Sequence, residues 1–376
     1  MKNNKTFKLL PLAIAAAMSA ETMAAITLYD EADTSFSVDG LFNTYYVNSD
    51  TETDGAEDSS QARVKMGFLP NYIGFNFSKK VDDLTVGGRS SFWVSTSDSD
   101  LNRNNETTDA GTDTLIDVRQ FYATVDGSFG QVLLGKDFAL FNRSNILGDE
   151  ILLGYGQTIT TGDDGGNVSF GNIGTGYLYP FPNSQITYRS PDMNGFKVAI
   201  GLLDPTKSSA NSEESSPRIE GEATYNFSND NFSAKGWVGF MTQKSEDKVA
   251  DTEVKSSGTS YGLNVKFSGL SVTASGFKGE GVGAAGLGHI LTADDAEVDG
   301  MLLQASYSIG SERFVISRGE NEGGTTDGGN QLDMENQTLA WFHSVNSNLT
   351  LVVEHNKAET DITETKTLAL GAVVTF

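Results

Sequence analysis

The 376-residue chain has no cysteine. Disulfides therefore cannot stabilise its fold, and zinc–thiolate sites and cysteine nucleophiles are excluded. No run of 18 apolar residues occurs after residue 24, so the sequence predicts no membrane-spanning helix. Basic residues are scarce: 26 Lys and Arg stand against 50 Asp and Glu, a formal net charge of −24. Such a charge repels nucleic acid and argues against nucleic acid as a partner.

Histidine is also rare, because the chain contains only three. They are far apart in the sequence, and none accompanies an obvious nucleophile or a set of metal ligands. We therefore expect no enzyme activity, no cofactor and no metal site.

The N-terminus has the pattern of a secretory signal peptide. Three lysines lie within the first eight residues, an apolar run covers 9–18, and small residues precede Ala25. A short buried helix is the alternative interpretation of the apolar run. We expect residues 1–24 to be removed on export, leaving one domain, 25–376.

Beyond residue 25 the dominant pattern is apolar–polar alternation with a period of two, which is typical of strands with one apolar face. It is clearest in four segments: 36–46, 260–267, 301–309 and 349–355. A soluble β-sandwich would show the same alternation, but there both apolar faces are buried against each other. Here the opposite faces carry Arg, Lys, Asn and Gln, as expected for the water-filled interior of a transmembrane barrel.

The connections between these segments alternate in length. Short turns are expected at 81–83, 128–130, 192–194, 228–230, 268–269, 310–312 and 346–348. Long polar stretches lie between them, at 49–60, 96–113, 138–182, 205–216, 245–257, 280–297, 321–334 and 357–365. Outer-membrane barrels combine short periplasmic turns with long external loops, so this alternation favours an antiparallel transmembrane β-barrel. Counting gives about 16 strands if 61–80 is one strand bent at Pro70.

The last eleven residues form a strand with an apolar face that reaches the C-terminus. Every second residue counted back from the end is apolar: Leu368, Leu370, Ala372, Val374 and Phe376. We expect this row to face lipid, and the alternate row, which carries no charge, to face the channel.

Three segments resemble the Gram-negative trimeric porins, general diffusion type. Residues 119–137 are similar to that family's hairpin ahead of its third external loop, 183–196 to the strand that leaves the loop, and Phe376 to its closing aromatic residue. The resemblance implies a homotrimer of barrels in the cell outer membrane, each narrowed by a third loop that folds into the lumen. It further implies the C-terminal row as the insertion signal for the barrel-assembly machinery, and contacts with outer-membrane lipid and lipopolysaccharide.

The third loop, expected at 138–182, is the longest, and a 45-residue loop without structure of its own is usually functional. Its first part is too apolar to stay in water, so we expect it to pack inside the barrel. Asp149 and Glu150 are the candidate acidic side of the pore constriction, with Asp163 and Asp164 as the less favoured pair. A cluster of three aromatic residues at 177–181 either stacks on sugar rings or anchors the loop.

Basic residues of the wall would complete the constriction. Strand alternation places five of them on the inner face: Arg63, Lys65, Arg89, Arg119 and Arg189. The inward assignment of Arg63 and Lys65 assumes that Phe68 faces outward. The inward assignment of Arg119 assumes that Tyr122 faces outward. An ion pair with a neighbouring carboxylate, such as Asp117 beside Arg119, is the alternative for each.

The sequence therefore predicts a porin for passive diffusion of small hydrophilic solutes and ions. The acidic charge favours cations, although charge on external loops acts at the mouth of a channel more than at its narrowest point. A solute-selective porin, for a sugar or a small organic acid, is the alternative function. An outer-membrane hydrolase and a purely adhesive surface barrel are less favoured.

Overall fold

The computed structural model describes residues 25–98, 116–159, 168–283, 297–323 and 333–376. The expected signal peptide and the pair Asp163 and Asp164 lie outside these ranges. No helix within them is long and apolar enough to cross a membrane. The elements are β1 Ile26–Glu31, β2 Thr34–Thr53, β3 Ser59–Lys65, β4 Asn71–Val81, β5 Leu84–Val94, β6 Asp117–Gly127, β7 Gly130–Phe138, α2 Arg143–Leu147, β8 Thr158–Ile159, β9 Val168–Ser169, β10 Pro182–Arg189, β11 Phe196–Leu203, β12 Ser212–Glu213, β13 Arg218–Ser228, β14 Phe232–Asp247, β15 Thr252–Phe267, β16 Leu270–Glu280, β17 Glu297–Ile309, β18 Glu312–Gly323, β19 Met334–Asn346, β20 Leu349–Thr360 and β21 Thr363–Thr375.

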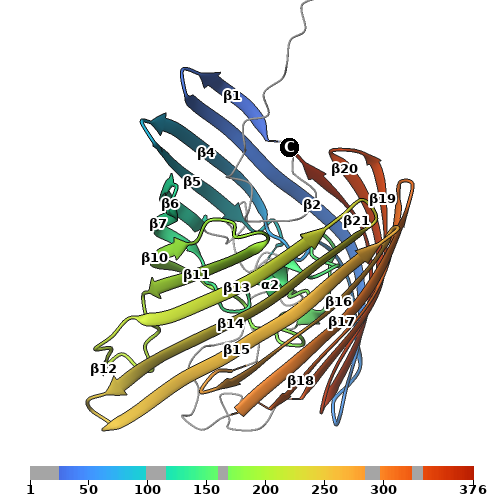
Figure 1. Ribbon diagram of the computed structural model, residues 1–376. Coiled ribbons are helices and arrows are strands. Elements are labelled where there is room, and N and C mark those ends of the chain that lie inside the picture. The colour runs from blue at the N-terminus through green and yellow to red at the C-terminus, as the bar shows by residue number, and fades with distance from the viewer. Residues whose placement is uncertain (1–24, 99–115, 160–167, 284–296, 324–332) are drawn as a thin grey trace, which may run out of the picture.

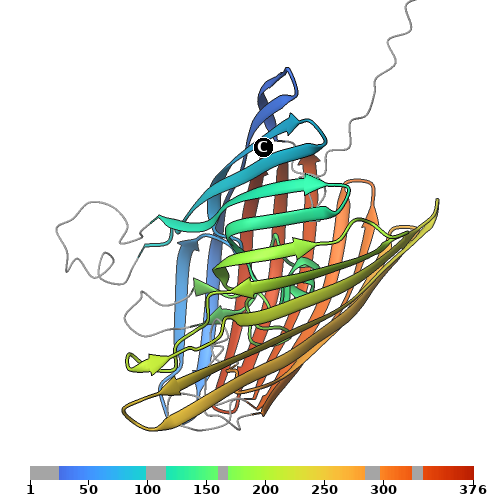
Figure 2. The same ribbon diagram turned by 60° about the vertical axis from the view of Figure 1, so that its left-hand side comes forward.

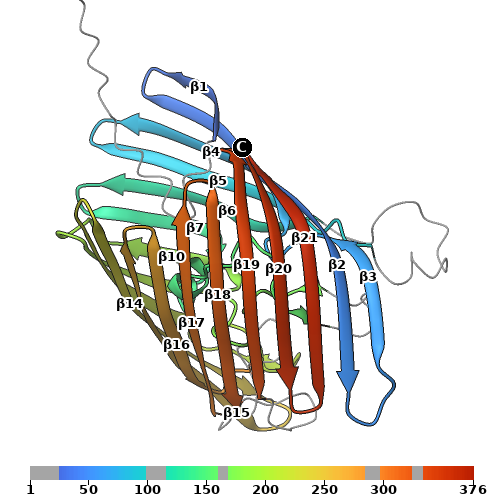
Figure 3. The same cartoon turned by 90° about the vertical axis from the view of Figure 1, so that its right-hand side faces the viewer.

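Sixteen antiparallel strands close into a barrel, as the sequence predicts (Figures 1 and 3). Strands that follow one another along the wall are hydrogen-bonded, and β2 pairs with β21 to close the ring. Both β3 and β4 pair with β2, so together they form one wall strand interrupted at 66–70. The interruption confirms the bend expected at Pro70, because proline cannot donate a hydrogen bond to the ladder.

The two ends of the barrel differ in their connections. At the end that carries the C-terminus, the strands are joined by short turns at the predicted positions (Figure 1). At the other end, three of the predicted long loops are wrong: β2 and β3 are separated only by 54–58, β14 and β15 by 248–251, and β20 and β21 by 361–362. These strands continue as paired polar hairpins beyond the apolar band. There both faces consist mainly of polar residues, so apolar alternation no longer marks them.

The height of the wall varies around the barrel. Strands β7, β10 and β11 have 9, 8 and 8 residues, whereas β14 and β15 have 16 each (Figure 2). Short β1 pairs with the start of β2, beyond the point where β21 ends. The C-terminal Phe376 exchanges two backbone hydrogen bonds with Gly40 there, of 2.8 and 3.1 Å.

Side chains divide between two faces, as expected for a transmembrane barrel. On β21, Leu368, Leu370 and Val374 are exposed on the outer face, whereas Ala369 and Val373 are buried on the inner face. The main hydrophobic cluster lies within the barrel, where third-loop residues such as Ile151 and Tyr155 pack against wall residues such as Tyr45. The third loop therefore supplies much of the core.

Candidate functional site: the loop inside the barrel

The described parts of the third loop, 139–159 and 168–181, lie inside the barrel between the end of β7 and the start of β10. Their short helix α2 is fixed to the far wall by Asn145, which accepts a hydrogen bond from Trp237 Nε1 (2.8 Å) and donates one to the Gly276 carbonyl (3.0 Å). Further on, Tyr45 Oη donates to the Leu153 carbonyl from the opposite side. Because the loop contacts both sides of the barrel, it crosses the lumen instead of projecting outside.

Two buried wall carboxylates hold the loop backbone. Glu220 on β13 accepts hydrogen bonds from the backbone N–H groups of residues 140 and 141, at 2.7 and 2.8 Å. Glu354 on β20 accepts from those of residues 155 and 156. A Cβ added at Gly154 would lie 2.2 Å from a Glu354 oxygen, so a larger residue there would force this carboxylate to shift. These four bonds satisfy backbone donors that would otherwise be buried without partners.

Asp149, which belongs to the third loop, is hydrogen-bonded both to other residues of the loop and to the wall. Its carboxylate accepts hydrogen bonds from Tyr177 Oη (2.7 Å), Gln304 Nε2 (2.8 Å) and Asn172 Nδ2 (3.1 Å). Its side chain is buried, and this burial raises the pKa of Asp149 while the hydrogen bonds act in the opposite direction. In this position the carboxylate joins two parts of the loop to β17.

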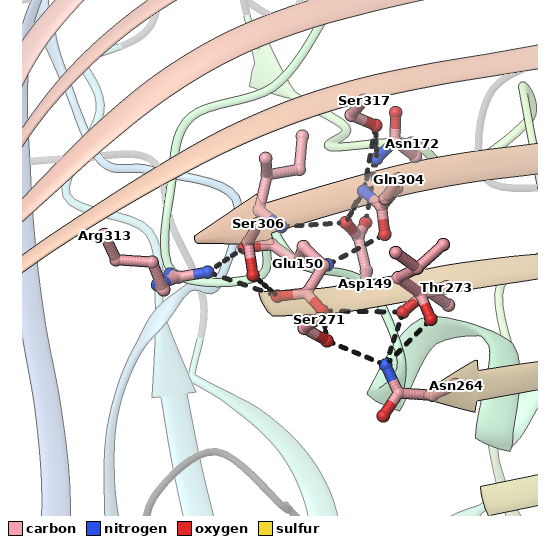
Figure 4. Close-up of polar contacts among 12 residues, drawn as sticks. Asp149, Glu150, Asn172, Asn264, Ser271, Thr273, Gln304, Ser306, Arg313 and Ser317 are labelled. Atoms are coloured by element: carbon pink, nitrogen blue, oxygen red, sulfur yellow. Dashed lines mark hydrogen bonds and ion pairs between the residues drawn. The ribbon is translucent and has the colours of Figure 1, made fainter. Parts of the chain in front are cut away.

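Glu150 instead reaches the channel side of β16, β17 and β18 (Figure 4). Its carboxylate accepts hydrogen bonds from Ser271 Oγ (2.6 Å) and Ser306 Oγ (3.0 Å). Arg313 Nη1 lies 3.4 Å from the same carboxylate and donates to the Glu150 backbone carbonyl (2.7 Å). The Glu150 and Arg313 side chains keep 13% and 28% of their surface exposed, so this ion pair faces the lumen.

The predicted basic residues lie on a different part of the wall. Arg63 and Lys65 are buried on β3, where Arg63 donates to the Asp98 carbonyl. Arg89 on β5 binds the Asp39 carboxylate through two nitrogens, at 2.7 and 3.0 Å. These cations are therefore held in polar networks of the wall.

Arg119 and Arg189 have carboxylate partners as well. Arg119 donates to Asp117 (2.7 Å) and to Tyr179 Oη of the third loop (2.9 Å). Arg189 on β10 lies 3.3 Å from the Asp137 carboxylate. In a ring of sixteen strands, β5, β6 and β10 lie apart from β16–β18. The structure thus places predicted basic residues and Glu150 on different sectors of the lumen.

Two facing assignments from the sequence are wrong. Phe121 is 61% exposed on the outer face, so its neighbour Tyr122 points inward, toward Arg89 and Asp137. Arg119 still faces the loop because β6 contains a bulge opposite β5, which restores the alternation. Phe68 is buried against Gly171 of the third loop, because the interrupted segment between β3 and β4 turns it inward.

The aromatic residues at the end of the loop are anchors. Tyr177 is fully buried and Tyr179 nearly so, and Tyr179 contacts Phe138 and Phe181 with edge-to-face rings. Arg119 lies 5.1 Å from the centroid of the Trp93 ring beneath them. Because the rings of Tyr177 and Tyr179 are covered, they cannot stack on a passing sugar, and the half-buried Phe181 packs on Tyr179.

Comparison with known proteins agrees with this architecture. The model of the Gram-negative porin family matches residues 11–363. The chain belongs to the Gram-negative porin family. No curated protein sequence matches it.

Solved porins share the fold at low sequence identity. The outer membrane channel DcaP of Acinetobacter baumannii has 16% identity and a TM-score of 0.64, covering 93% of this chain and 100% of its own. The anion-selective porin from Comamonas acidovorans has 15% sequence identity and a TM-score of 0.65, and the match covers 91% of this chain and 100% of its own. OmpF of Salmonella typhi, solved in complex with daunomycin, has 14% sequence identity and a TM-score of 0.61, and the match covers 93% of this chain and 100% of its own. The porin is therefore an outer-membrane diffusion channel and not an enzyme.

Sequence reasoning missed several residues of the porin's lumen. Arg313 was not among the candidates, although it follows a short turn and alternates with the outward Phe314. Glu220 and Glu354 were missed as well, since an isolated carboxylate in a strand gives no sign that a distant loop will bind it. Only the fold brings them to the loop.

The adjacent carboxylates should respond differently to neutralisation. Glu150→Gln leaves Arg313 without its counter-charge at the lumen, so the K⁺/Cl⁻ permeability ratio should fall roughly fivefold, because one charge at about 8 Å in water changes the K⁺ and Cl⁻ terms by a little over twofold each, in opposite directions. Asp149→Asn should leave that ratio unchanged, because Asp149 is buried. It should make the open channel noisier, because an NH₂ group replaces one of the two accepting oxygens, faces hydrogen-bond donors and loosens the loop. Reversal potentials in a KCl gradient measure the ratio. An equal fall in both variants would contradict this division.

Proposed function

We propose that this porin lets small hydrophilic solutes and ions diffuse through a single water-filled path, with a preference for cations that arises at its external mouth. The supporting observation is the third loop bound across the lumen on both sides, which narrows the barrel without leaving it. The walls around the loop carry charged residues of both signs, so the lumen itself has no dominant charge.

Carboxylates at the mouth support the cation preference. The hairpin between β2 and β3 carries four exposed acidic residues and no basic one: Glu52, Asp54, Glu57 and Asp58. Together with the net charge of −24, they create a negative potential that raises the local concentration of cations.

The preference should depend on ionic strength. Exposed mouth charges act over about 30 Å at 0.01 M salt but only about 3 Å at 1 M. Reversal potentials of the reconstituted porin in KCl gradients should therefore show cation preference at low salt and almost none at high salt. Anion preference at low salt would refute the proposed role of the mouth, and absence of any channel would refute the function itself.

Subunit and membrane contacts form the remaining part of the proposal. An outward aromatic face covers the start of the barrel: Phe36, Phe42, Phe75, Phe77, Phe92 and Phe376. Together with membership of the porin family, this face supports a homotrimer. At the external end of β20 and β21, outward Lys357 and Lys366 pair with Glu364. Such charges suit contact with the polar groups of lipopolysaccharide.

A further inference from the structure

Two lysines lie close together on the inner wall, outside the Glu150 site and the predicted basic set. Lys235 on β14 is directly opposite Asn264 on β15, and Lys266 is opposite Ser233. In this register the two lysines are diagonal neighbours on one face of adjacent strands. The face is the inner one, because Val238 and Leu263 on the alternate positions are exposed on the outside.

The described residues offer these lysines no ion pair. The charged groups that act on Lys235 are Glu222, Arg143 and Lys266. Arg143 already shares the Asp137 carboxylate with Arg189, at 3.8 and 3.3 Å. One carboxylate, Glu222, therefore stands among three cations, and this sector of the lumen has an excess of positive charge.

The Lys235 ammonium is positioned by an aromatic ring. Its Nζ lies 5.5 Å from the centroid of the Trp237 ring, within the range of a cation–π interaction. The indole is itself fixed by the hydrogen bond from its Nε1 to Asn145 of α2. A held cation loses little side-chain entropy when an anion binds it.

The lysines lie beside the narrowed part of the channel. Asn264 is the residue opposite Lys235 in the strand register. It donates hydrogen bonds to Ser271 Oγ (2.9 Å) and Thr273 Oγ1 (2.8 Å) (Figure 4). Ser271 in turn donates to Glu150. An anion at the lysines would therefore lie next to the Glu150 site, in the path of solutes that pass the loop.

We propose that Lys235 and Lys266 form a binding site for the carboxylate groups of small organic anions in transit. The proposal rests on the porin being an open channel and names one class of solute for it. Two ammonium groups on neighbouring strands suit a dicarboxylate, and Lys266, which is exposed, is the first to meet a solute from the end with the short turns. Glu150 is saturated by Ser271, Ser306 and Arg313, so it does not compete for the lysines.

The test uses succinate as the probe on the full-length porin in planar bilayers. Adding potassium succinate to a KCl bath should reduce the chloride-carried current saturably in the wild type. The double variant K235Q/K266Q should keep its KCl channels but need about tenfold more succinate for the same reduction, since two ion pairs are lost. The variant K235R/K266R, which keeps both charges, should retain the wild-type response.

The control is K207Q/K248Q, which removes the same charge at the external loops. It should leave the succinate response unchanged. Equal succinate responses of the wild type and K235Q/K266Q, or an equal loss in K207Q/K248Q, would overturn the site while leaving the channel function intact. Heat-modifiable migration in gels shows that each variant is assembled. A wild type that forms no channels would refute the channel function instead.

Discussion

Replacing Glu354 by alanine is expected to release the middle of the third loop and to give larger, noisier single-channel currents. The substitution leaves the backbone N–H groups of residues 155 and 156 buried without an acceptor. Each such group costs about 1–3 kcal/mol. A loss of about 3 kcal/mol shifts the equilibrium between bound and released loop by roughly a hundredfold.

A graded series strengthens this test. Glu354→Gln keeps one carbonyl acceptor, so its currents should lie between those of the wild type and the alanine variant. Glu359→Ala is the matched control, because Glu359 lies on the same strand but pairs outside the lumen with Lys357. Wild-type currents in Glu354→Ala would show that the loop does not depend on this carboxylate.

Replacing Phe376 by alanine is expected to reduce the yield of assembled barrel by at least about tenfold, equivalent to about 1.4 kcal/mol. The Phe376 ring stacks on Phe42 at 5.7 Å, and its edge covers Gly40, where an added Cβ would lie 2.5 Å from a ring atom. The residue thus joins the last wall strand to the first, and it is also the proposed insertion signal.

The assembled fraction can be read from heat-modifiable migration in gels after refolding and after expression. A loss in both would point to ring closure, whereas a loss only in cells would point to recognition by the assembly machinery. Thr375→Ala is the control, since its backbone hydrogen bond to the Asn348 carbonyl survives the change. Normal yields of Phe376→Ala under both conditions would contradict either role.

The wall of the barrel was predictable because lipid imposes a period of two on the outward residues. The strand count, the short turns and the two faces of β21 all follow from that constraint. Where strands extend beyond the lipid, as in the hairpin of β14 and β15, both faces are polar and the constraint vanishes, so the sequence wrongly predicted loops there. Bulges are similarly invisible, and Arg119 reached its predicted side only because one bulge corrected an error in the count.

The interior was harder to predict because its contacts join residues far apart in the chain. Asp149 and Glu150 are neighbours with the same chemistry, and nothing local tells which is buried. Gln304 holds one and Arg313 the other, each more than 150 residues away. The assignment of an anchor and a lumen-facing charge therefore depends on the completed barrel.

We infer that the porin is an open channel, which a loop bound across its lumen narrows. Single-channel recording of the purified wild type in KCl tests it most directly. We predict channels that open without a ligand, conduct linearly at low voltage, and close in three equal steps as expected for a trimer. Bilayers that stay silent at protein levels where OmpF inserts and conducts would contradict the account.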